Sequence, residues 1–402
     1  MGRGVFLNVS GGGHVIATYG MVGELVARGE TITYYEAPKF QRDIEALGAE
    51  FRPYGPIRPY PGPLAQYPYH HELDLPPVMT WIALEWLPRL LPEIRALKPD
   101  YIVHDSLCLW GRVVAEKLGV PAVCSVHTPA VTWPLLLRVG RYWRDMPRMA
   151  ARSHRSLRFF RTLARQLGEE YGVEKTGFID LLSNVQPQTI CHTPRELQPY
   201  GETFGATYHF VGSVHDRPVK TAFPFDRIRE PFIYVGFGTI CDPGPAFFRN
   251  CLSAFAGLDY QVVMILSDST VPEDLGAVPS NAIIWSLKRD GLAPQLDLLP
   301  RASLFVMNGG NGGARESAWF GVPMIAVPTT FETDTISMRI DAQGAGTRIP
   351  PQRATPERLR RAALEILANP SYARNSRRIG DACRASGGSM RAADVVLQAV
   401  RG

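Results

Sequence analysis

Short apolar segments alternate with helical patterns along the first half of this 402-residue chain. Helices are predicted near residues 17–28, 40–47, 81–97 and 111–118, between segments rich in β-branched and aromatic residues. Those segments predict strands at Val5–Val9, Thr31–Tyr35, Tyr101–His104 and Ala122–Val126. Because parallel strands need long crossover connections, this order favours a parallel sheet with helices on both faces. The first half is therefore predicted to be an α/β domain.

The same alternation begins again in the second half. Strands are predicted at Phe232–Gly236, Gln261–Leu266, Ala282–Trp285, Leu304–Met307 and Met324–Val327. Helices are predicted near 246–256, 294–299, 313–320, 335–342, 355–368 and 370–385. A chain of this length suits two domains better than one core. The predicted fold is α/β, with two Rossmann-like domains whose parallel sheets face each other across a cleft, where ligands bind beyond the carboxyl ends of the strands.

Residues 211–231 separate the two patterns. Pro218, Pro224 and Pro231 lie in this segment, which has little periodicity and is typical of a linker. We therefore expect an N-terminal domain at 1–212, a linker at 213–231 and a C-terminal domain at 232–385. The last predicted helix, within 386–402, is expected to pack back on the N-terminal domain.

Composition excludes several other classes of protein. Hydrophobic residues make up 45% of the chain and charged residues 20%, as in ordinary globular proteins. The formal net charge of +5 is small for this length, so no nucleic-acid partner is expected. The six cysteines lie far apart without a C-x-x-C motif, which argues against a disulfide framework or a zinc site. The first residues lack a signal-peptide pattern and no apolar stretch approaches membrane-spanning length, so we expect a cytoplasmic protein.

A glycine-rich turn follows the first predicted strand, in the stretch "NVSGGGHVI" at residues 8–16. Such a turn at a helix N-terminus often binds phosphate. The dinucleotide fingerprint has three glycines, of which Gly11 and Gly13 would be the first two, but Ile16 stands at the position of the third. His14 lies where the strand stops and the helix begins. A lone histidine there is most often solvated or a cap, so catalysis is only one of its possible roles.

A second glycine-rich turn lies in "LFVMNGGNGGARESAWFGVPMIAVP", residues 304–328. Glycines flank Asn311 on both sides, and the following helix carries Glu316 in its first turns. Backbone amides in such a turn can bind an anion, although a tight connection without a ligand is the alternative. Glu332 and Thr333 follow the next strand, and Gln295 enters the preceding helix. These polar groups are suited to hold a nucleotide base, a diphosphate and a sugar.

Over nearly its whole length the chain resembles the two-domain (GT-B) glycosyltransferases of the macrolide and natural-product type. The resemblance rests on "GGGHV", "PDYIVHDSLCLWGRVVAEKLGVPAV", "YVGFGTI", "APQ", the second glycine turn with "GVPMIAVP", and the closing "GGSMRAADVV", in this order. It implies inverting transfer of a hexose from a UDP- or dTDP-sugar to a hydroxyl of a lipophilic acceptor such as a macrolide, polyketide or aromatic aglycone. It also implies that no cofactor and no metal ion are needed.

The resemblance implies roles for individual residues. His14 corresponds to the general base, and Asp105 to the aspartate that orients it, although an aspartate after a strand often only caps a helix. An imidazole with a pKa near 6.5 can take the proton of an attacking hydroxyl, and a carboxylate on its other nitrogen fixes its tautomer. The implied donor-binding residues are Gly238, Thr239, Gln295, Asn308, Gly310, Asn311, Gly312, Gly313, Glu316, Glu332 and Thr333.

The donor site departs from the family pattern at several positions. Asn308 stands where a histidine usually contacts the diphosphate, and Thr333 stands where a glutamine usually follows the acid. Leu292 replaces an aromatic residue before the "PQ" motif, after a segment "SLKRDG" that is lengthened. Three departures in one site indicate an altered donor specificity.

The acceptor pocket is expected in the N-terminal domain, where residues 52–75 and 127–146 are rich in aromatic residues and proline. Their aromatic side chains suit an apolar small molecule, although each of them could instead only cover the core. The candidate acceptor-binding residues are Tyr67, Trp81, His127, Trp133 and Trp143.

Arginines recur every three or four residues from Arg138 to Arg165, with Asp145 as the only acid among them. This spacing predicts a basic stripe on one face of a helical stretch that is bent near Pro147. A solvated face is the ordinary explanation. Contact with an anionic membrane surface, an acidic acceptor or an acidic partner is the alternative, and it would make the protein peripheral at the membrane.

Two alternatives to a transferase remain open at this stage. One is a non-catalytic protein of the same fold that binds nucleotide sugars or natural products, as Asn308 and Thr333 suggest. The other is a nucleotide-sugar epimerase, which would need carboxylates in the cleft. Release of UDP or dTDP without an acceptor, sugar epimerisation, or binding alone would distinguish them. The sequence does not predict the oligomeric state.

Overall fold

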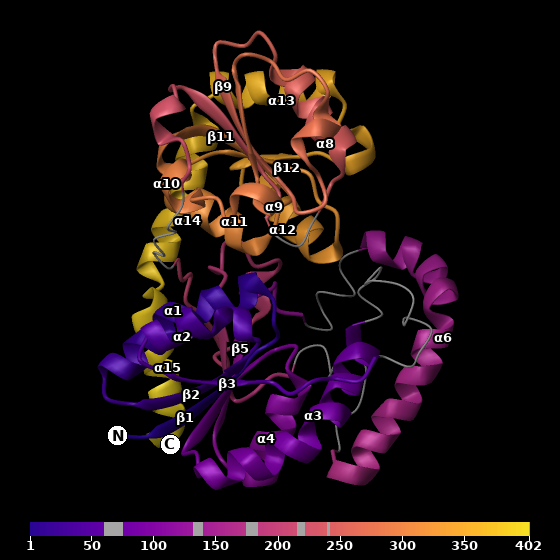
Figure 1. Cartoon of the computed structure of the whole chain (residues 1–402), viewed down its shortest axis with the longest axis vertical. Coiled ribbons are helices and arrows are strands. Elements are labelled where there is room, and N and C mark those ends of the chain that lie inside the picture. Colours follow the sequence, from indigo (N-terminus) through magenta and orange to yellow (C-terminus); the bar gives the residue numbers. More distant parts are fainter. Residues whose placement is uncertain (60–74, 132–139, 174–183, 215–221, 239–241, 402) are drawn as a thin grey trace. The chain divides into compact units, whose positions relative to one another are not determined.

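The computed structural model describes residues 1–59, 75–131, 140–173, 184–214, 222–238 and 242–401, with the backbone alone at 140–153, 155 and 156. These residues form two compact units (Figure 1). Unit 1 comprises Met1–His192, Glu202–Ser213 and Gly387–Gly402, and unit 2 comprises Thr193–Gly201 and Val214–Ser386.

Unit 1 contains a parallel sheet of seven strands in the order β3-β2-β1-β4-β5-β6-β7. The strands are β1 (Arg3–Leu7), β2 (Thr31–Glu36), β3 (Glu50–Pro53), β4 (Tyr101–Asp105), β5 (Ala122–Val126), β6 (Gln188–Cys191) and β7 (Tyr208–Phe210). The helices are α1 (Gly12–Ala27), α2 (Gln41–Ala46), α3 (Leu75–Leu97), α4 (Leu109–Leu118), α6 (Gly140–Tyr171) and α15 (Gly388–Arg401). Short 3-10 turns lie at Pro38–Phe40 and Gly201–Thr203.

Alternation along the strands places apolar side chains on both faces of this sheet. Val5 and Leu7 of β1 join a core with α3, α4 and α6, whereas Phe6 between them joins a second core with α1, α2 and α15. Figure 1 shows these two groups of helices on opposite sides of the sheet. A sheet buried on both faces explains why its strands are continuous apolar runs in the sequence.

Unit 2 contains a parallel sheet of six strands in the order β10-β9-β8-β11-β12-β13. The strands are β8 (Phe232–Gly236), β9 (Gln261–Leu266), β10 (Ala282–Ser286), β11 (Ala302–Met307), β12 (Met324–Ala326) and β13 (Gly346–Arg348). The helices are α8 (Pro245–Phe255), α9 (Leu287–Asp290), α10 (Gln295–Leu298), α11 (Asn311–Trp319), α12 (Phe331–Ala342), α13 (Pro356–Ala368) and α14 (Ser371–Ala385). Short 3-10 turns lie at Phe225–Arg227, Pro272–Leu275, Leu299–Arg301 and Pro351–Arg353.

The two parallel α/β domains that the sequence predicts are confirmed, but some boundaries differ. Helix α1 begins at Gly12 rather than near residue 17, so the last glycines of the first turn are helical. Residues 193–201 belong to unit 2 rather than to the N-terminal domain. Phe223 and Ile228, in the segment predicted to be a linker, are buried in the core of unit 2 and so anchor this segment to it. Helix α15 packs on α1 in unit 1.

Candidate active site

The order of the strands in unit 1 changes direction between β1 and β4, which are hydrogen-bonded neighbours. Ligands of such sheets bind at this point, beyond the carboxyl ends of the strands. His14 lies in the first turn of α1, just after β1, and Asp105 is the last residue of β4. The topology therefore places both residues at the switch point, although 91 positions separate them in the sequence.

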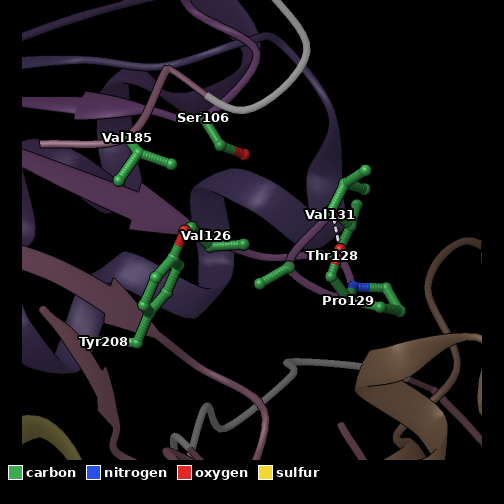
Figure 2. Close-up of a pocket in the computed structure, with 8 residues that line it drawn as sticks. Ser106, Val126, Thr128, Pro129, Val131, Val185 and Tyr208 are labelled. Atoms are coloured by element: carbon green, nitrogen blue, oxygen red, sulfur yellow. Dashed lines mark hydrogen bonds between the residues drawn. The ribbon is translucent and has the colours of Figure 1, made fainter. Parts of the chain in front are cut away.

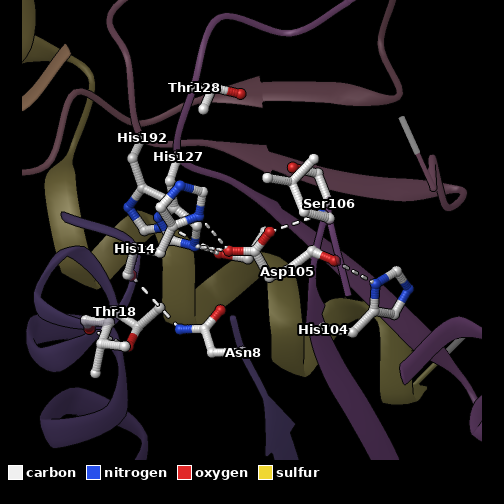
Figure 3. A network of polar contacts seen from close by, with 12 residues as sticks. Asn8, His14, Thr18, His104, Asp105, Ser106, His127, Thr128 and His192 are labelled. Carbon is white, nitrogen blue, oxygen red and sulfur yellow. Dashed lines mark hydrogen bonds and ion pairs between the residues drawn. The ribbon is translucent and has the colours of Figure 1, made fainter. Parts of the chain in front are cut away.

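The His14 ring and the Asp105 carboxylate form a close pair (Figure 3). His14 Nδ1 lies 2.6 Å from Asp105 Oδ2, and the Leu107 backbone N–H donates to Oδ1 at 2.7 Å. Asp105 is fully buried, whereas the His14 side chain is 15% exposed. Burial opposes ionisation of Asp105, but the charge and hydrogen bond of His14, the charge of His127 and the Leu107 N–H together lower its pKa. The pair is thus arranged with a buried anion behind a more accessible imidazole.

His127 is one of the predicted acceptor-binding residues, and the structure places it beside Asp105. It follows β5, it is 5% exposed, and its Nε2 lies 3.6 Å from Asp105 Oδ2. Its ring centroid lies 5.2 Å from that of His14 and 4.5 Å from that of His192, on which it stacks. Ser125 Oγ lies 3.1 Å from His127 Nε2. These contacts make His127 part of the buried surroundings of the His14–Asp105 pair.

Of the other predicted acceptor residues, only Trp81 has a described side chain. Trp81 on α3 is half-buried against the core, and the Arg58 guanidinium lies 5.6 Å from its ring centroid. Tyr67 and Trp133 lie outside the described residues, and so does the side chain of Trp143, whose backbone belongs to α6. A small cavity of about 10 Å³ next to Ser106 has room for roughly one water, not for an aglycone (Figure 2). Its lining residues are Ser106, Val126, Thr128, Pro129, Ala130, Val131, Val185 and Tyr208.

A buried carboxyl supports the turn that precedes helix α1 and His14. Glu36, at the end of β2, accepts hydrogen bonds from the Ser10 hydroxyl and from the Ala37 N–H at Oε1. Within the described residues its Oε2 has no hydrogen-bond partner. Burial raises the pKa of Glu36 to about 7 and the Asp105 charge adds to this, while the bonds from Ser10 and Ala37 oppose it.

This carboxyl predicts a pH dependence of stability. Its folded-state pKa lies above the ordinary value of 4.5, so its contribution is fully present below pH 4.5 and is lost as pH rises through about 7. Glu36→Gln removes the ionisation. The quantity measured is the free energy of unfolding of the variant minus that of the wild type, from urea unfolding. We expect this difference to be roughly 1–3 kcal/mol larger at pH 8 than at pH 5. Glu45→Gln, at an exposed position on α2, is the control and is expected to show no such difference; equal behaviour of both variants would contradict the assignment.

The second glycine-rich turn occupies the corresponding place in unit 2. The strand order changes direction between β8 and β11, and the turn follows β11 directly. Asn308 Oδ1 accepts the Gly310 N–H at 3.0 Å, and Gly309 has a φ of +77°, a conformation that favours glycine. Helix α11 begins at Asn311, whose Nδ2 donates to Thr193 Oγ1 at 2.6 Å. The turn therefore aims the first backbone N–H groups of α11, which include Gly312 and Gly313, out of the carboxyl edge.

Two hydrogen bonds in series hold the Glu316 side chain in the first turns of α11. Tyr234 of β8 donates from its hydroxyl to Gln295 Oε1 at 3.1 Å, and Gln295 Nε2 donates to Glu316 Oε2. Burial raises the pKa of Glu316, while the Gln295 bond and the Arg315 charge oppose this. Glu316 Oε1 is not engaged by Gln295, so this carboxylate is suited to accept hydroxyl hydrogen bonds from a ligand.

Thr333 has a structural role at the start of α12. The Thr330 and Thr333 side chains form a capping box at the start of α12, in which Thr333 Oγ1 accepts the Thr330 N–H at 2.9 Å. Thr333 is 4% exposed, whereas Glu332 is half-buried.

Leu292, before the "PQ" motif, is exposed. Gly238 follows β8 with a φ of +67°, and Thr239 lies outside the described residues.

Several residues in these two sites were not predicted from the sequence. Ser125, His192 and Ser213 belong to or follow strands of unit 1, and β6 and β7 were not predicted. Tyr234 lies inside a predicted strand, and Thr193 is separated from Asn311 by 118 positions. The only available signal was their position next to the carboxyl ends of strands. Among the described residues, no group of three or more His, Cys, Asp or Glu could hold a metal ion.

Known proteins resemble this chain over most of its length. A family model described as "Erythromycin biosynthesis protein CIII-like, C-terminal domain" matches residues 249–394. The oleandomycin glycosyltransferase of Streptomyces antibioticus is 29% identical over 396 residues, which cover 97% of this chain and 89% of that protein. The solved glycosyltransferase of kitacinnamycin is 26% identical with a TM-score of 0.84, covering 99% of this chain and 98% of that one. The chain is a natural-product glycosyltransferase with the GT-B fold.

A further relative, the Uncharacterized UDP-glucosyltransferase YojK of Bacillus subtilis (strain 168), is 29% identical over 410 residues, covering 100% of this chain and 98% of that protein. These similarities extend over both units of the glycosyltransferase, not over one of them alone. They favour an enzyme that transfers sugar over the binding protein and the epimerase that the sequence left open. No helix in the described part of this glycosyltransferase is both long and apolar enough to cross a membrane.

Proposed function

We propose that this glycosyltransferase moves a hexose, with inversion, from a UDP- or dTDP-sugar to a hydroxyl of a lipophilic natural product such as a macrolide, polyketide or aromatic aglycone. The observation that carries the proposal is the 2.6 Å contact between His14 Nδ1 and the buried Asp105 carboxylate at the switch point of unit 1. The relatives' names, oleandomycin glycosyltransferase and UDP-glucosyltransferase, support an antibiotic-like acceptor and a UDP-sugar donor.

The chemistry follows from the position of the proton on His14. Asp105 accepts the Nδ1–H, so the lone pair of the neutral ring lies on Nε2. As the acceptor oxygen attacks the anomeric carbon, its proton passes to Nε2, and Asp105 stabilises the imidazolium. The new carbon–oxygen bond forms on the face opposite the leaving group, so the configuration inverts. The electron pair of the broken bond leaves with the nucleoside diphosphate.

Unit 2 supplies the groups that hold the donor in this proposal. The backbone N–H groups at the start of α11 and the positive end of its dipole stabilise the diphosphate without a metal ion. Glu316, held by Gln295, accepts hydrogen bonds from the ribose hydroxyls. Glu332, in the first turn of α12, accepts hydrogen bonds from the hydroxyls of the sugar in this proposal. Asn308 keeps its Nδ2 for the diphosphate, because its Oδ1 is occupied by the Gly310 N–H.

A panel of nucleotide sugars tests the proposed donor. UDP-glucose and dTDP-glucose are each offered with an aliphatic alcohol, a phenol or no acceptor, and nucleoside diphosphate release is measured together with product mass. The proposal predicts a glycoside with at least one donor, and far slower release without an acceptor. Epimerised sugar without transfer, or binding without turnover across the panel, would overturn it.

The Asn308 position gives a prediction about the donor. In Asn308→His, an imidazole would have to replace an amide that caps the turn through Oδ1, and it would leave the Gly310 N–H without its present acceptor. Such a loss costs about 1–3 kcal/mol, so kcat/KM is expected to fall roughly 5- to 150-fold with the preferred donor. The measurement is kcat/KM across the donor panel. A gain with every donor would show that the site only tolerates asparagine.

The arginine stripe gives a second prediction. Arg158, Arg161 and Arg165 of α6 are exposed; the side chains of the remaining arginines from Arg138 to Arg155 lie outside the described residues. If the stripe binds an anionic membrane surface, replacing these three residues by glutamine removes about 1 kcal/mol per charge and lowers binding to phosphatidylserine vesicles by roughly 10²-fold at low salt. Vesicle co-sedimentation measures the binding. The difference is expected to shrink at high salt, and unchanged partitioning would leave only a solvated face.

A further inference from the structure

A row of polar side chains follows the carboxyl edge of the unit 1 sheet away from His14. It starts at Asp105 on β4 and continues through the neighbouring strands β5, β6 and β7. Asp105 and Ser125 are register partners on β4 and β5, and His192 directly follows Cys191, the register partner of Val126. The row therefore crosses four adjacent strands. Its members are Asp105, Ser125, His127, His192 and Ser213.

The members of this row are linked by short contacts. Ser213 Oγ lies 2.7 Å from His192 Nδ1, and His192 Nε2 lies 2.9 Å from Ser125 Oγ. Ser125 Oγ lies 3.1 Å from His127 Nε2, which lies 3.6 Å from Asp105 Oδ2. All five side chains are buried, at 5% exposure or less. The buried hydrogen bonds from Ser213 through His192 and Ser125 hold His127 in a fixed orientation, and the 3.6 Å contact of His127 with Asp105 is electrostatic.

The carboxylate at one end sets the direction of these hydrogen bonds. Asp105 favours an N–H, not a lone pair, on the ring nitrogen that faces it, so His127 carries its proton on Nε2. His127 Nε2–H then donates to Ser125 Oγ, with Asp105 Oδ2 3.6 Å from the same nitrogen, and the Ser125 hydroxyl donates to His192 Nε2. His192 is left with its proton on Nδ1, which donates to Ser213 Oγ. The His127 Nε2–H, the Ser125 hydroxyl and the His192 Nδ1–H then each have an acceptor in the row.

We infer that His127 is a positioning residue of the transfer reaction: with Ser125, His192 and Ser213 behind it, it presents an N–H to the same carboxylate oxygen of Asp105 that bonds His14. The inference rests on the proposed function of His14 as the base. His127 does not touch the reacting atoms in this account. It keeps Asp105 ionised and turned toward His14, so that the carboxylate is in place when the imidazolium forms.

Two substitutions at position 127 separate positioning from packing. His127→Leu has a similar size but no N–H, whereas His127→Gln places an amide N–H near the original Nε2. We expect His127→Leu to lower kcat about 10-fold or more with an aliphatic alcohol acceptor, with KM for donor and acceptor changed less than about 2-fold. His127→Gln is expected to recover most of kcat.

His104→Gln is the matched control. His104 is also a buried histidine of β4, but its Nε2 faces Gln186 and its Nδ1 faces the Asp105 backbone oxygen rather than the carboxylate. We expect this variant to retain wild-type kcat. The acid limb of the kcat/KM pH profile is expected to move in His127→Leu and to stay in place in His104→Gln. Among the described residues, the charged and titratable groups that face Asp105 or its neighbours in the row are His14, Glu36, His104, Cys108, Cys124, His127 and His192.

Nitrogen-15 NMR of the histidine side chains tests the same inference on the wild-type protein without substrate. The expected result is a proton on Nε2 of His127 and on Nδ1 of His192. A proton on Nδ1 of neutral His127 would overturn the inference, and so would an unchanged kcat in His127→Leu. Equal losses in His127→Leu and His127→Gln with an unmoved pH profile would show a packing role only. If the wild type transferred no sugar, the proposed function would fail, while the NMR result would still decide this point.

Discussion

Replacing His14 with alanine is expected to lower kcat by roughly 10²–10⁴-fold with an aliphatic alcohol acceptor, because this is the usual contribution of a positioned general base. His14 is the partly exposed member of the pair with Asp105, so its ring is the part of the pair that an acceptor can reach. The measurement is steady-state transfer by purified wild type and variant, with donor and acceptor varied separately.

Two comparisons make this prediction specific to base catalysis. A phenol acceptor ionises near pH 10 without help, so His14→Ala is expected to lose less activity with a phenol than with an aliphatic alcohol. Stabilisation of the variant by UDP or dTDP should match that of the wild type, because the proposed donor groups belong to unit 2. Near-normal rates with the aliphatic alcohol would show that His14 is not the base.

Replacing Gly309 with alanine is expected to destabilise the protein by about 2–5 kcal/mol. Its φ of +77° is strained for any residue with a Cβ, and a Cβ there would lie 2.7 Å from the Thr333 backbone oxygen and also against Ser337 Oγ. Relief of these clashes requires the glycine turn to move away from α12. We therefore expect a lower melting temperature and at least about 10-fold weaker binding of UDP or dTDP, measured by calorimetry.

Gly312→Ala is the matched control within the same turn. Gly312 lies in the first turn of α11, its φ is not positive, and no described atom lies within 4 Å of a Cβ built on it. Because alanine is the better helix former, this variant is expected to be as stable as the wild type or up to about 1 kcal/mol more stable. A Gly309→Ala protein as stable as Gly312→Ala would contradict the close packing of the turn against α12.

The sequence predicted the fold well because both sheets are parallel and buried on two faces. Their strands are nearly continuous apolar runs, as in β8 and β9, and such runs are visible in a single sequence. Shorter or more polar strands such as β7 escaped prediction, since three residues carry little periodicity. The start of α1 was placed too late, because glycines at the first helical positions suggest a turn rather than a helix.

The candidate site was predictable where one residue follows one predicted strand, as His14 and Asp105 do. The contact of His127 with Asp105 was not predicted, since it depends on the register of β4 and β5. The role of Thr333 was not predictable, because the capping box at the start of α12 depends on the backbone conformation at Thr330. The pattern of residue types in the sequence does not predict the register between distant strands or the local backbone conformation, and both contacts depend on these.

The configuration of the product tests the account most directly. The wild-type enzyme is incubated with an α-linked nucleotide sugar, UDP-glucose or dTDP-glucose, and an aliphatic alcohol, and the anomeric proton of the glycoside is examined by NMR. Direct attack by an oxygen that His14 deprotonates predicts a β-glycoside, in amounts that fall sharply in His14→Ala. An α-glycoside, or a β-glycoside formed equally well by His14→Ala, would contradict the account.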